Sequence, residues 1–355
     1  MPKSILTRMG DGERVSMPAD GVKEEILLGT QDAAQDGDIP ELTAEDLEQL
    51  FDIMAEPGRT VSVPHGAEVV VTDDGCAKLF CSGPADGGAG LPISRQNSIL
   101  AYERGFAADT VSIGHEDYSF KPVKPIIDYE AQTYFATAQA TTVPFFYGAQ
   151  PNLGLYYRPD GPHPNPADLL PLGKIEEAQA AQVSAAEQLT EDMVYVGKRL
   201  ADIGCEGLNL DTAGSAGDAD LYATLMAVVE LKKQAPLMAI EVGMSNDFVL
   251  GMHGEIEFEG RRLAGMYPHD QAQVSTVAGA DIFGPTVNVN TSRSIAWNLA
   301  RAVTFVKHTA EVSEIPVHPN VGMGVCGVPM CVESPIDCVT RASKALVMIG
   351  KADGL

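Results

Sequence analysis

Long apolar runs are absent from this sequence of 355 residues: no stretch of 18 or more apolar residues occurs, which excludes a membrane-spanning helix. The N-terminus also lacks a signal-peptide core, because charged residues, Arg8 and Asp11, come directly after its first few residues. We therefore expect a soluble, cytoplasmic protein. Basic residues are scarce as well, with 24 Lys and Arg against 49 Asp and Glu and a formal charge of −25. Nucleic-acid phosphates need a basic surface, so a nucleic-acid partner is excluded. The acidity is equally compatible with ordinary solubility and with a salty cytoplasm.

Signatures of metal and dinucleotide binding are missing too. The six cysteines form no C-x-x-C pair, and the short intervals between them match no common zinc pattern. We therefore expect reduced structural thiols and no metal site. No G-x-G-x-x-G motif follows an early strand, which disfavours a dinucleotide-binding sheet.

The first hundred residues are predicted to form a helical and hairpin extension. Asp20 is expected to cap one helix, and a second is predicted from Thr43, with apolar residues at the spacing of one buried face, until Pro57-Gly58 stops it. The segments at 68–72 and 77–80, joined through Asp74-Gly75, are typical of a β-hairpin. We place a boundary near residue 100, which divides the chain into regions 1–100 and 101–355.

After that boundary, short apolar strands alternate with long amphipathic helices. The predicted helices are Lys174–Ile203, Asp218–Gln234, Ser292–Val312 and Ile336–Ile349, and Trp297 on the third is expected in the core. The predicted strands are Thr110–Ile113, Val143–Tyr147, Gly207–Asp211, Met238–Val242, Asp281–Phe283 and Ile315–His318. Such strands joined through helices indicate an α/β fold with a covered parallel sheet. A closed barrel and an open doubly wound sheet both satisfy this pattern.

Polar residues follow four of these strands at their carboxyl ends, where ligands bind in either architecture. Gln150 and Asn152 come after the strand that holds Tyr147, while Asp211, Glu241 and His318 end or follow three others. The repetition predicts a concave polar site. Only six strands are clear, and the last predicted helix runs almost to residue 355. The pattern is therefore expected to be one unit short of a closed barrel.

Several longer segments resemble the dimethylamine methyltransferases, a family of corrinoid methyltransferases, and the similarity runs in order through the whole chain. The segments are Arg8–Gly12, Asp117–Pro125, Tyr147–Gly161, Gly251–Gly254, Asn290–Phe305 and Val339–Ala345. The resemblance implies a (β/α)8 TIM-type barrel that transfers a methyl group from dimethylamine to the Co(I) corrinoid of a cognate corrinoid protein, releasing methylamine. It further implies a pyrrolysine directly after Leu355, so this chain is expected to lack its C-terminal barrel unit and to be inactive alone. Two alternatives stay open, a pyrrolysine-free corrinoid methyltransferase for another methylated amine and a non-catalytic module that docks a corrinoid protein.

The ordinary side chains are expected to supply proton transfer and orientation. By position, Glu241 and Asp211 are the candidate catalytic residues, although a structural ion pair or a turn would also explain them. Further candidates for residues that face the substrate or the corrinoid are Tyr147, Gln150, Asn152, His253 and His318. No cofactor is expected on the chain itself, because the corrinoid belongs to the partner protein, and a homo-oligomer is expected.

Overall fold

In the computed structural model, the chain forms two compact units. One unit comprises Met1–Val143, Val287–Glu311 and Val317–Leu355, and the other comprises Pro144–Thr286 and Val312–Pro316. The structure describes residues 4–69, 150–202, 204–205, 207–251, 254–321 and 335–355, together with the backbone of 76–80, 90–94 and 145–149. The boundary predicted near residue 100 lies outside these residues and stays a prediction.

The second unit is built on a four-stranded parallel sheet. Its strands are β5 (Phe145–Ala149), β6 (Gly207–Ala213), β7 (Ala239–Met244) and β10 (Ile282–Gly284), and they pair in the order β10-β7-β6-β5. Each strand therefore lies beside the next parallel strand along the chain. Four of the six predicted strands are confirmed in place.

The two other predicted strands have different outcomes. Thr110–Ile113 lies outside the described residues. Ile315–His318 does not form a strand of its own, but the Pro316 carbonyl accepts a hydrogen bond from the Phe283 N–H of β10 at 3.0 Å. Pro316 therefore lies beside β10.

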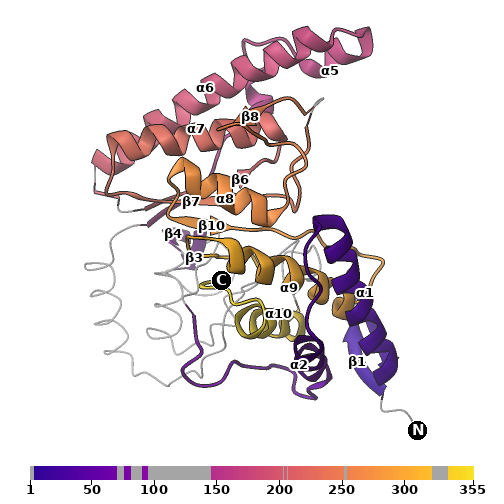
Figure 1. Ribbon diagram of the computed structural model, residues 1–355. Coiled ribbons are helices and arrows are strands. Elements are labelled where there is room, and N and C mark those ends of the chain that lie inside the picture. The colour runs from indigo at the N-terminus through magenta and orange to yellow at the C-terminus, as the bar shows by residue number, and fades with distance from the viewer. Residues whose placement is uncertain are drawn as a thin grey trace. The chain divides into compact units, whose positions relative to one another are not determined.

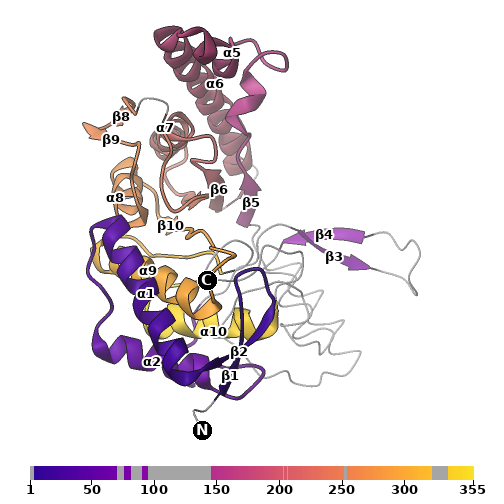
Figure 2. The ribbon, with the colours of Figure 1, turned by 90° about the vertical axis from the view of Figure 1, so that its right-hand side faces the viewer.

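Helices connect the strands of this sheet and lie along one side of it (Figures 1 and 2). The long connections are α6 (Ile175–Asp202), α7 (Asp218–Gln234) and α8 (Pro268–Ala278), of which the first two were predicted closely from their apolar spacing. The smaller elements are η3 (Leu153–Tyr156), α5 (Pro166–Leu169), η4 (Leu170–Leu172), β8 (Glu257–Phe258) and β9 (Arg261–Arg262).

The two faces of the sheet differ in chemistry because side chains alternate along each strand. One face is apolar and fully buried in the core with α7, and it carries Leu208, Leu210, Ile240, Val242 and Phe283. The residues between them point to the opposite face. That second face carries the polar side chains described below.

In its described residues, the first unit is mainly helical. The helices in these residues are α1 (Ala19–Gly37), α2 (Ala44–Ala55), α9 (Ile295–Val312) and α10 (Ile336–Met348), beside the hairpin of β1 (Ser4–Arg8) and β2 (Arg14–Pro18). The predicted start of α2 is confirmed: Thr43 caps it in a reciprocal capping box with Asp46. The cap expected for α1 was wrong, since Pro18 holds the N-cap position and Asp20 lies in the first turn.

The contact between α1 and α9 is close and polar at its rim. Trp297 is 4% exposed, as predicted, and a Cβ on Gly29 would collide with its carbonyl oxygen. Arg301 of α9 pairs with Asp32 at 2.8 Å and with Asp36 at 3.1 Å, both on α1. Gly29 is therefore what allows the two backbones to approach each other.

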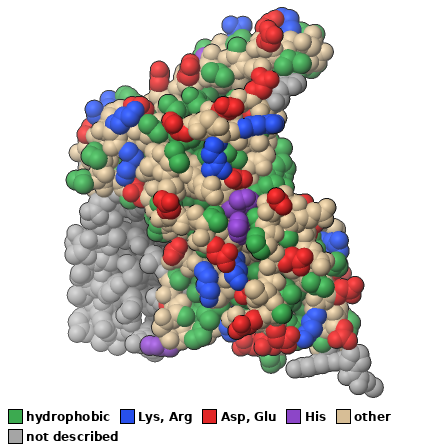
Figure 3. All heavy atoms as spheres, viewed as in Figure 1, with side chains coloured by type: hydrophobic (Ala, Val, Ile, Leu, Met, Phe, Trp, Pro, Cys, Tyr) green, Lys and Arg blue, Asp and Glu red, His purple; other side chains and the backbone are tan. Residues whose placement is uncertain are grey.

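The predicted N-terminal hairpin differs from the observed one. Strand β3 (Cys76–Phe80) matches the second predicted arm, but it pairs antiparallel with β4 (Gly90–Ser94), a stretch expected to begin in a flexible connection. Residues 70–75, which hold most of the predicted first arm and its turn, lie outside the description. No helix in the described segments has the length and apolarity to cross a membrane. Figure 3 shows acidic side chains spread over the viewed face and interspersed with Lys and Arg.

Candidate functional site

The polar face of the sheet carries Asn209 and Glu241 side by side. These residues are partners in the register of β6 and β7, and Tyr147 of β5 is the partner of Asn209 on the other side. Asn209 is 2% exposed and Glu241 is 5% exposed. Glu241 therefore lies on the sheet, but within β7 and not at the carboxyl end where it was predicted, and a buried amide accompanies it.

Asp211 reaches the same face from an irregular strand end. The pairing of β6 with β7 shifts register between Leu210 and Ala213, and Thr212 in this bulge has a φ of +64°. A β-branched residue rarely adopts the left-handed region, so the bulge stores backbone strain. Bulges of this kind redirect side chains and are common beside active sites.

The side-chain oxygens of Asp211 and Asn209 converge over Gly243 of β7. A Cβ added to Gly243 would lie 2.9 Å from Asp211 Oδ1 and 3.1 Å from Asn209 Oδ1. Asn209 Oδ1 is buried and accepts no hydrogen bond from any residue that the structure describes. Asn209, Asp211 and Glu241 are called the sheet-face cluster below. All three present oxygen acceptors, and the absence of a side chain at Gly243 leaves room for the oxygens.

A second polar group lies where α7 begins, next to the carboxyl ends of β5 and β6. Gln150, 7% exposed, accepts a hydrogen bond from Thr224 Oγ1 at 2.7 Å through Oε1. Its backbone N–H donates to the Asp211 carbonyl at 3.0 Å, which ties this group to the sheet-face cluster. Gln150 Nε2 lies near Asp220 but makes no hydrogen bond of good geometry to a described residue.

Asp220 is a buried carboxyl group of this second polar group with a perturbed pKa. It is fully buried, and burial raises its pKa from 3.8 to about 6, although hydrogen bonds from Ala216 and Ser215 oppose the shift. Burial, and then the nearby Asp220 and Asp218, raise the pKa of Tyr157 as well. A carboxyl group that changes protonation near pH 6 is suited to proton transfer at neutral pH.

The remaining predicted site residues have separate outcomes. Asn152 is exposed and caps η3, accepting from the Gly154 N–H at 2.7 Å. Tyr147 is placed only through its backbone, and His253 lies outside the described residues. His318 is partly buried and belongs to the other unit. The sequence-based assignment of these residues to the site therefore stays a prediction.

Asn209, Asp218, Asp220 and Tyr157 were missed from the sequence. Asp218 and Asp220 stand in the first turn of a helix, where acidic residues ordinarily complement the helix dipole. Asn209 is a polar residue between Leu208 and Leu210 in an otherwise apolar strand segment, and this was the signal available in the sequence. A polar residue in an otherwise apolar buried strand indicates a function for the face to which it points.

The sheet-face cluster can hold a small cation that carries N–H groups. Its two carboxylates and its amide oxygen are hydrogen-bond acceptors in a buried setting, where each hydrogen bond to a charged group is strong. No group of three or more His, Cys, Asp or Glu side chains in the described segments could hold a metal ion.

The comparison with protein families agrees with this chemistry. No solved structure matches the chain. Residues 3–355 match the dimethylamine methyltransferase family, whose substrate is a small amine. Because this match spans nearly the entire sequence, the chain belongs to the dimethylamine methyltransferase family.

Proposed function

We propose that the protein transfers a methyl group from dimethylamine to the Co(I) corrinoid of a cognate corrinoid protein and releases methylamine. The observation that carries this assignment is the sheet-face cluster, a buried group of acceptors on a parallel sheet. Dimethylamine is a cation at neutral pH with two N–H groups, and the acceptors of Glu241, Asp211 and Asn209 match both its charge and its donors. The formal charge of −25 also favours the approach of a cation.

We infer further that the four strands form an arc of a (β/α)8 barrel. Each strand pairs with the next parallel strand in the chain, whereas a doubly wound sheet reverses its order at a switch point. The three connecting helices lie on one side, and the polar face is the other side. In a barrel that polar face would line the interior near the strand carboxyl ends, where active sites of this fold lie.

The side chains of this chain are assigned proton handling and orientation. When the C–N bond of the amine breaks, its electron pair stays on nitrogen, which leaves easily only if it keeps its proton. A carboxylate that accepts a hydrogen bond from the N–H holds that proton in place and orients the methyl group. Pyrrolysine, which the family resemblance implies and the 355 residues do not contain, would supply an electrophilic imine for capturing the amine.

The proposal is tested with the protein isolated from its source cells, dimethylamine and the reduced corrinoid protein, by following the cobalt absorbance. We expect methylation of the corrinoid, and in the Glu241→Gln variant we expect kcat to fall by about 10²–10⁴-fold, the usual contribution of a positioned acid–base group. Glu177→Gln, at the exposed start of α6, is the matched control and should leave kcat unchanged.

The outcomes separate the alternatives. A Glu241→Gln variant that unfolds more easily but transfers methyl normally would show a structural ion-pair role for Glu241. Binding of the corrinoid protein without any methyl transfer would indicate a docking module. Transfer from a different methylated amine and not from dimethylamine would contradict the proposed substrate.

A further inference from the structure

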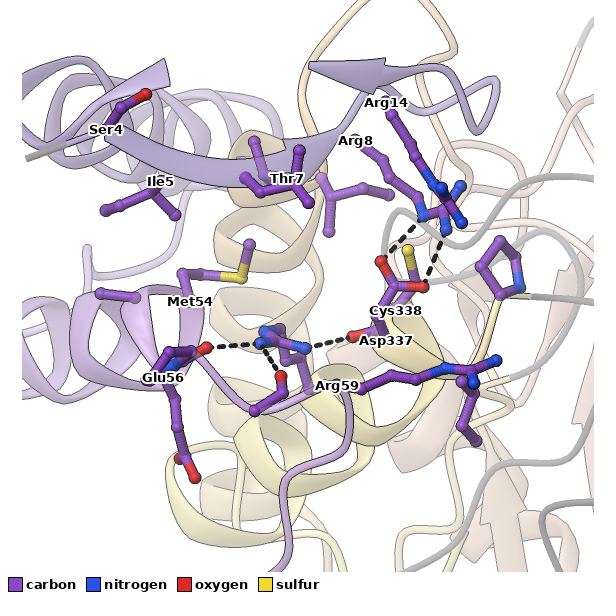
Figure 4. Close-up of a pocket in the computed structure, with 18 residues that line it drawn as sticks. Ser4, Ile5, Thr7, Arg8, Arg14, Met54, Glu56, Arg59, Asp337 and Cys338 are labelled. Atoms are coloured by element: carbon purple, nitrogen blue, oxygen red, sulfur yellow. Dashed lines mark hydrogen bonds and ion pairs between the residues drawn. The ribbon is translucent and has the colours of Figure 1, made fainter. Parts of the chain in front are cut away.

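A cavity of about 550 Å³ lies in the first unit, and none of its lining residues belongs to the polar sheet face (Figure 4). Its walls are the β1–β2 hairpin, the segment Ala55–Arg59 after α2, and the start of α10. Four of the chain's twelve arginines line it, although acidic residues outnumber basic ones two to one in the whole sequence. They are Arg8, Arg14, Arg59 and Arg341.

Two of these arginines are held by the protein itself. Arg8 forms a two-bond ion pair with Asp337, at 2.8 and 3.1 Å. Arg341 is 8% exposed and donates to three backbone carbonyls, those of Asp337, Glu56 and Gly58, at 2.6–2.9 Å. These two guanidinium groups therefore build the cavity wall.

The other two guanidinium groups are not neutralised. Arg14 and Arg59 are exposed, and their side chains form no ion pair or hydrogen bond with the residues that the structure describes. The carboxylates that line the cavity are already engaged, Asp337 with Arg8 and Glu56 with Lys344 at 3.3 Å. The cavity thus carries about two surplus positive charges in a strongly acidic protein.

Two further features favour an anion at this place. Arg14 and Arg8 are direct partners across the β1–β2 hairpin, an unfavourable like-charge arrangement, and Asp337 balances the charge of Arg8 alone. Helix α10 begins at the cavity with Pro335 as its N-cap and with no side-chain cap, so the positive end of its dipole faces the same space. Figure 4 shows Arg8, Arg14 and Arg59 near this helix start.

The size and lining of the cavity indicate the kind of anion. A volume of about 550 Å³ exceeds the need of a bare inorganic ion and suits a small organic molecule. Ile5, Met54 and Ile295 provide an apolar wall for its body. Two free guanidinium forks beside a helix start suit a doubly charged, tetrahedral oxyanion. We propose that this cavity binds a small phosphate monoester, with Arg14 and Arg59 holding the phosphate.

The test is calorimetric titration and thermal unfolding of the whole protein with four probes: inorganic phosphate, adenosine 5′-monophosphate, adenosine and succinate. The two phosphates should bind and raise Tm, the monophosphate more strongly, while adenosine and succinate should not. Arg14→Gln and Arg59→Gln should each weaken phosphate binding by about tenfold or more, the loss expected for one charge-assisted pair. Arg199→Gln, an exposed arginine of α6 with the same change of charge, should not.

The proposal is overturned if neither phosphate binds, if succinate binds as well as the monophosphate, or if Arg199→Gln weakens binding as much as the two cavity variants. Arg14→Lys and Arg59→Lys cover the case in which a Gln variant folds poorly. They keep the charge and lose the two-pronged geometry, so they should bind phosphate more weakly than the native protein. Unchanged binding in these Lys variants also counts against the proposal.

Discussion

At the scale of single residues, Asp220 links protonation to folding. Its pKa of about 6 in the folded protein lies above the ordinary value of 3.8, because the carboxyl group is buried. The folded state therefore prefers the protonated form. Below about pH 4 the group is protonated in both the folded and the unfolded state and does not change the unfolding free energy. As pH rises from about 4 to 6, the unfolded state loses this proton while the folded state keeps it, so the unfolding free energy falls by up to about 3 kcal/mol.

Asp220→Asn removes this loss. Relative to the native protein, the variant should gain about 3 kcal/mol of unfolding free energy between pH 4 and pH 7. Urea unfolding at a series of pH values measures this difference. Parallel stability curves for the two proteins would show that Asp220 does not titrate as its burial demands.

At the scale of elements, the packing of α1 on α9 depends on one glycine. A Cβ at position 29 would meet the backbone of α9 at Trp297, and backbone cannot move aside as a flexible side chain can. Gly29→Ala should therefore lower the unfolding free energy by about 1–3 kcal/mol, as overpacking does. The measurement is denaturant unfolding.

Gly21→Ala in the same helix is the matched control. Its Cβ would meet side chains alone, the Pro18 ring at 3.3 Å and the end of the Met17 side chain at 3.9 Å, and alanine is the better helix former. This variant should be neutral or more stable by up to about 1 kcal/mol. Equal effects at positions 21 and 29 would contradict the close approach of α1 and α9.

At the scale of the whole molecule, the net charge of −25 sets the response to salt. Like charges repel in the compact state, and salt screens them: the Debye length falls from about 20 Å near 0.02 M to about 4 Å near 0.5 M. We expect Tm to rise over this range of NaCl, by about 2–4 °C for each kcal/mol of repulsion removed. A constant or falling Tm would show that ion pairs such as those of Arg301 outweigh the repulsion.

The sequence determined the local structure of this protein well. Helices α7 and α10 begin at the predicted residues, and α2 begins directly after its predicted cap, Thr43. Apolar spacing, and for α2 the capping group, act within a few residues of the chain. The strands that hold Asp211 and Glu241 were located for the same reason, and with them the carboxyl ends where a site could lie. The longer family resemblance, confirmed over residues 3–355, named the activity.

Only the tertiary structure decided which side chains meet. Asp211 and Asn209 converge over Gly243 because a bulge with Thr212 at positive φ turns the end of β6, and no local spacing encodes a register shift between two strands. The raised pKa of Asp220 likewise depends on burial by segments distant in the chain. The arginine cavity joins residues 8, 14, 59 and 341, and packing alone brings them together. Local patterns specify elements, whereas sites arise from contacts across long sequence separations.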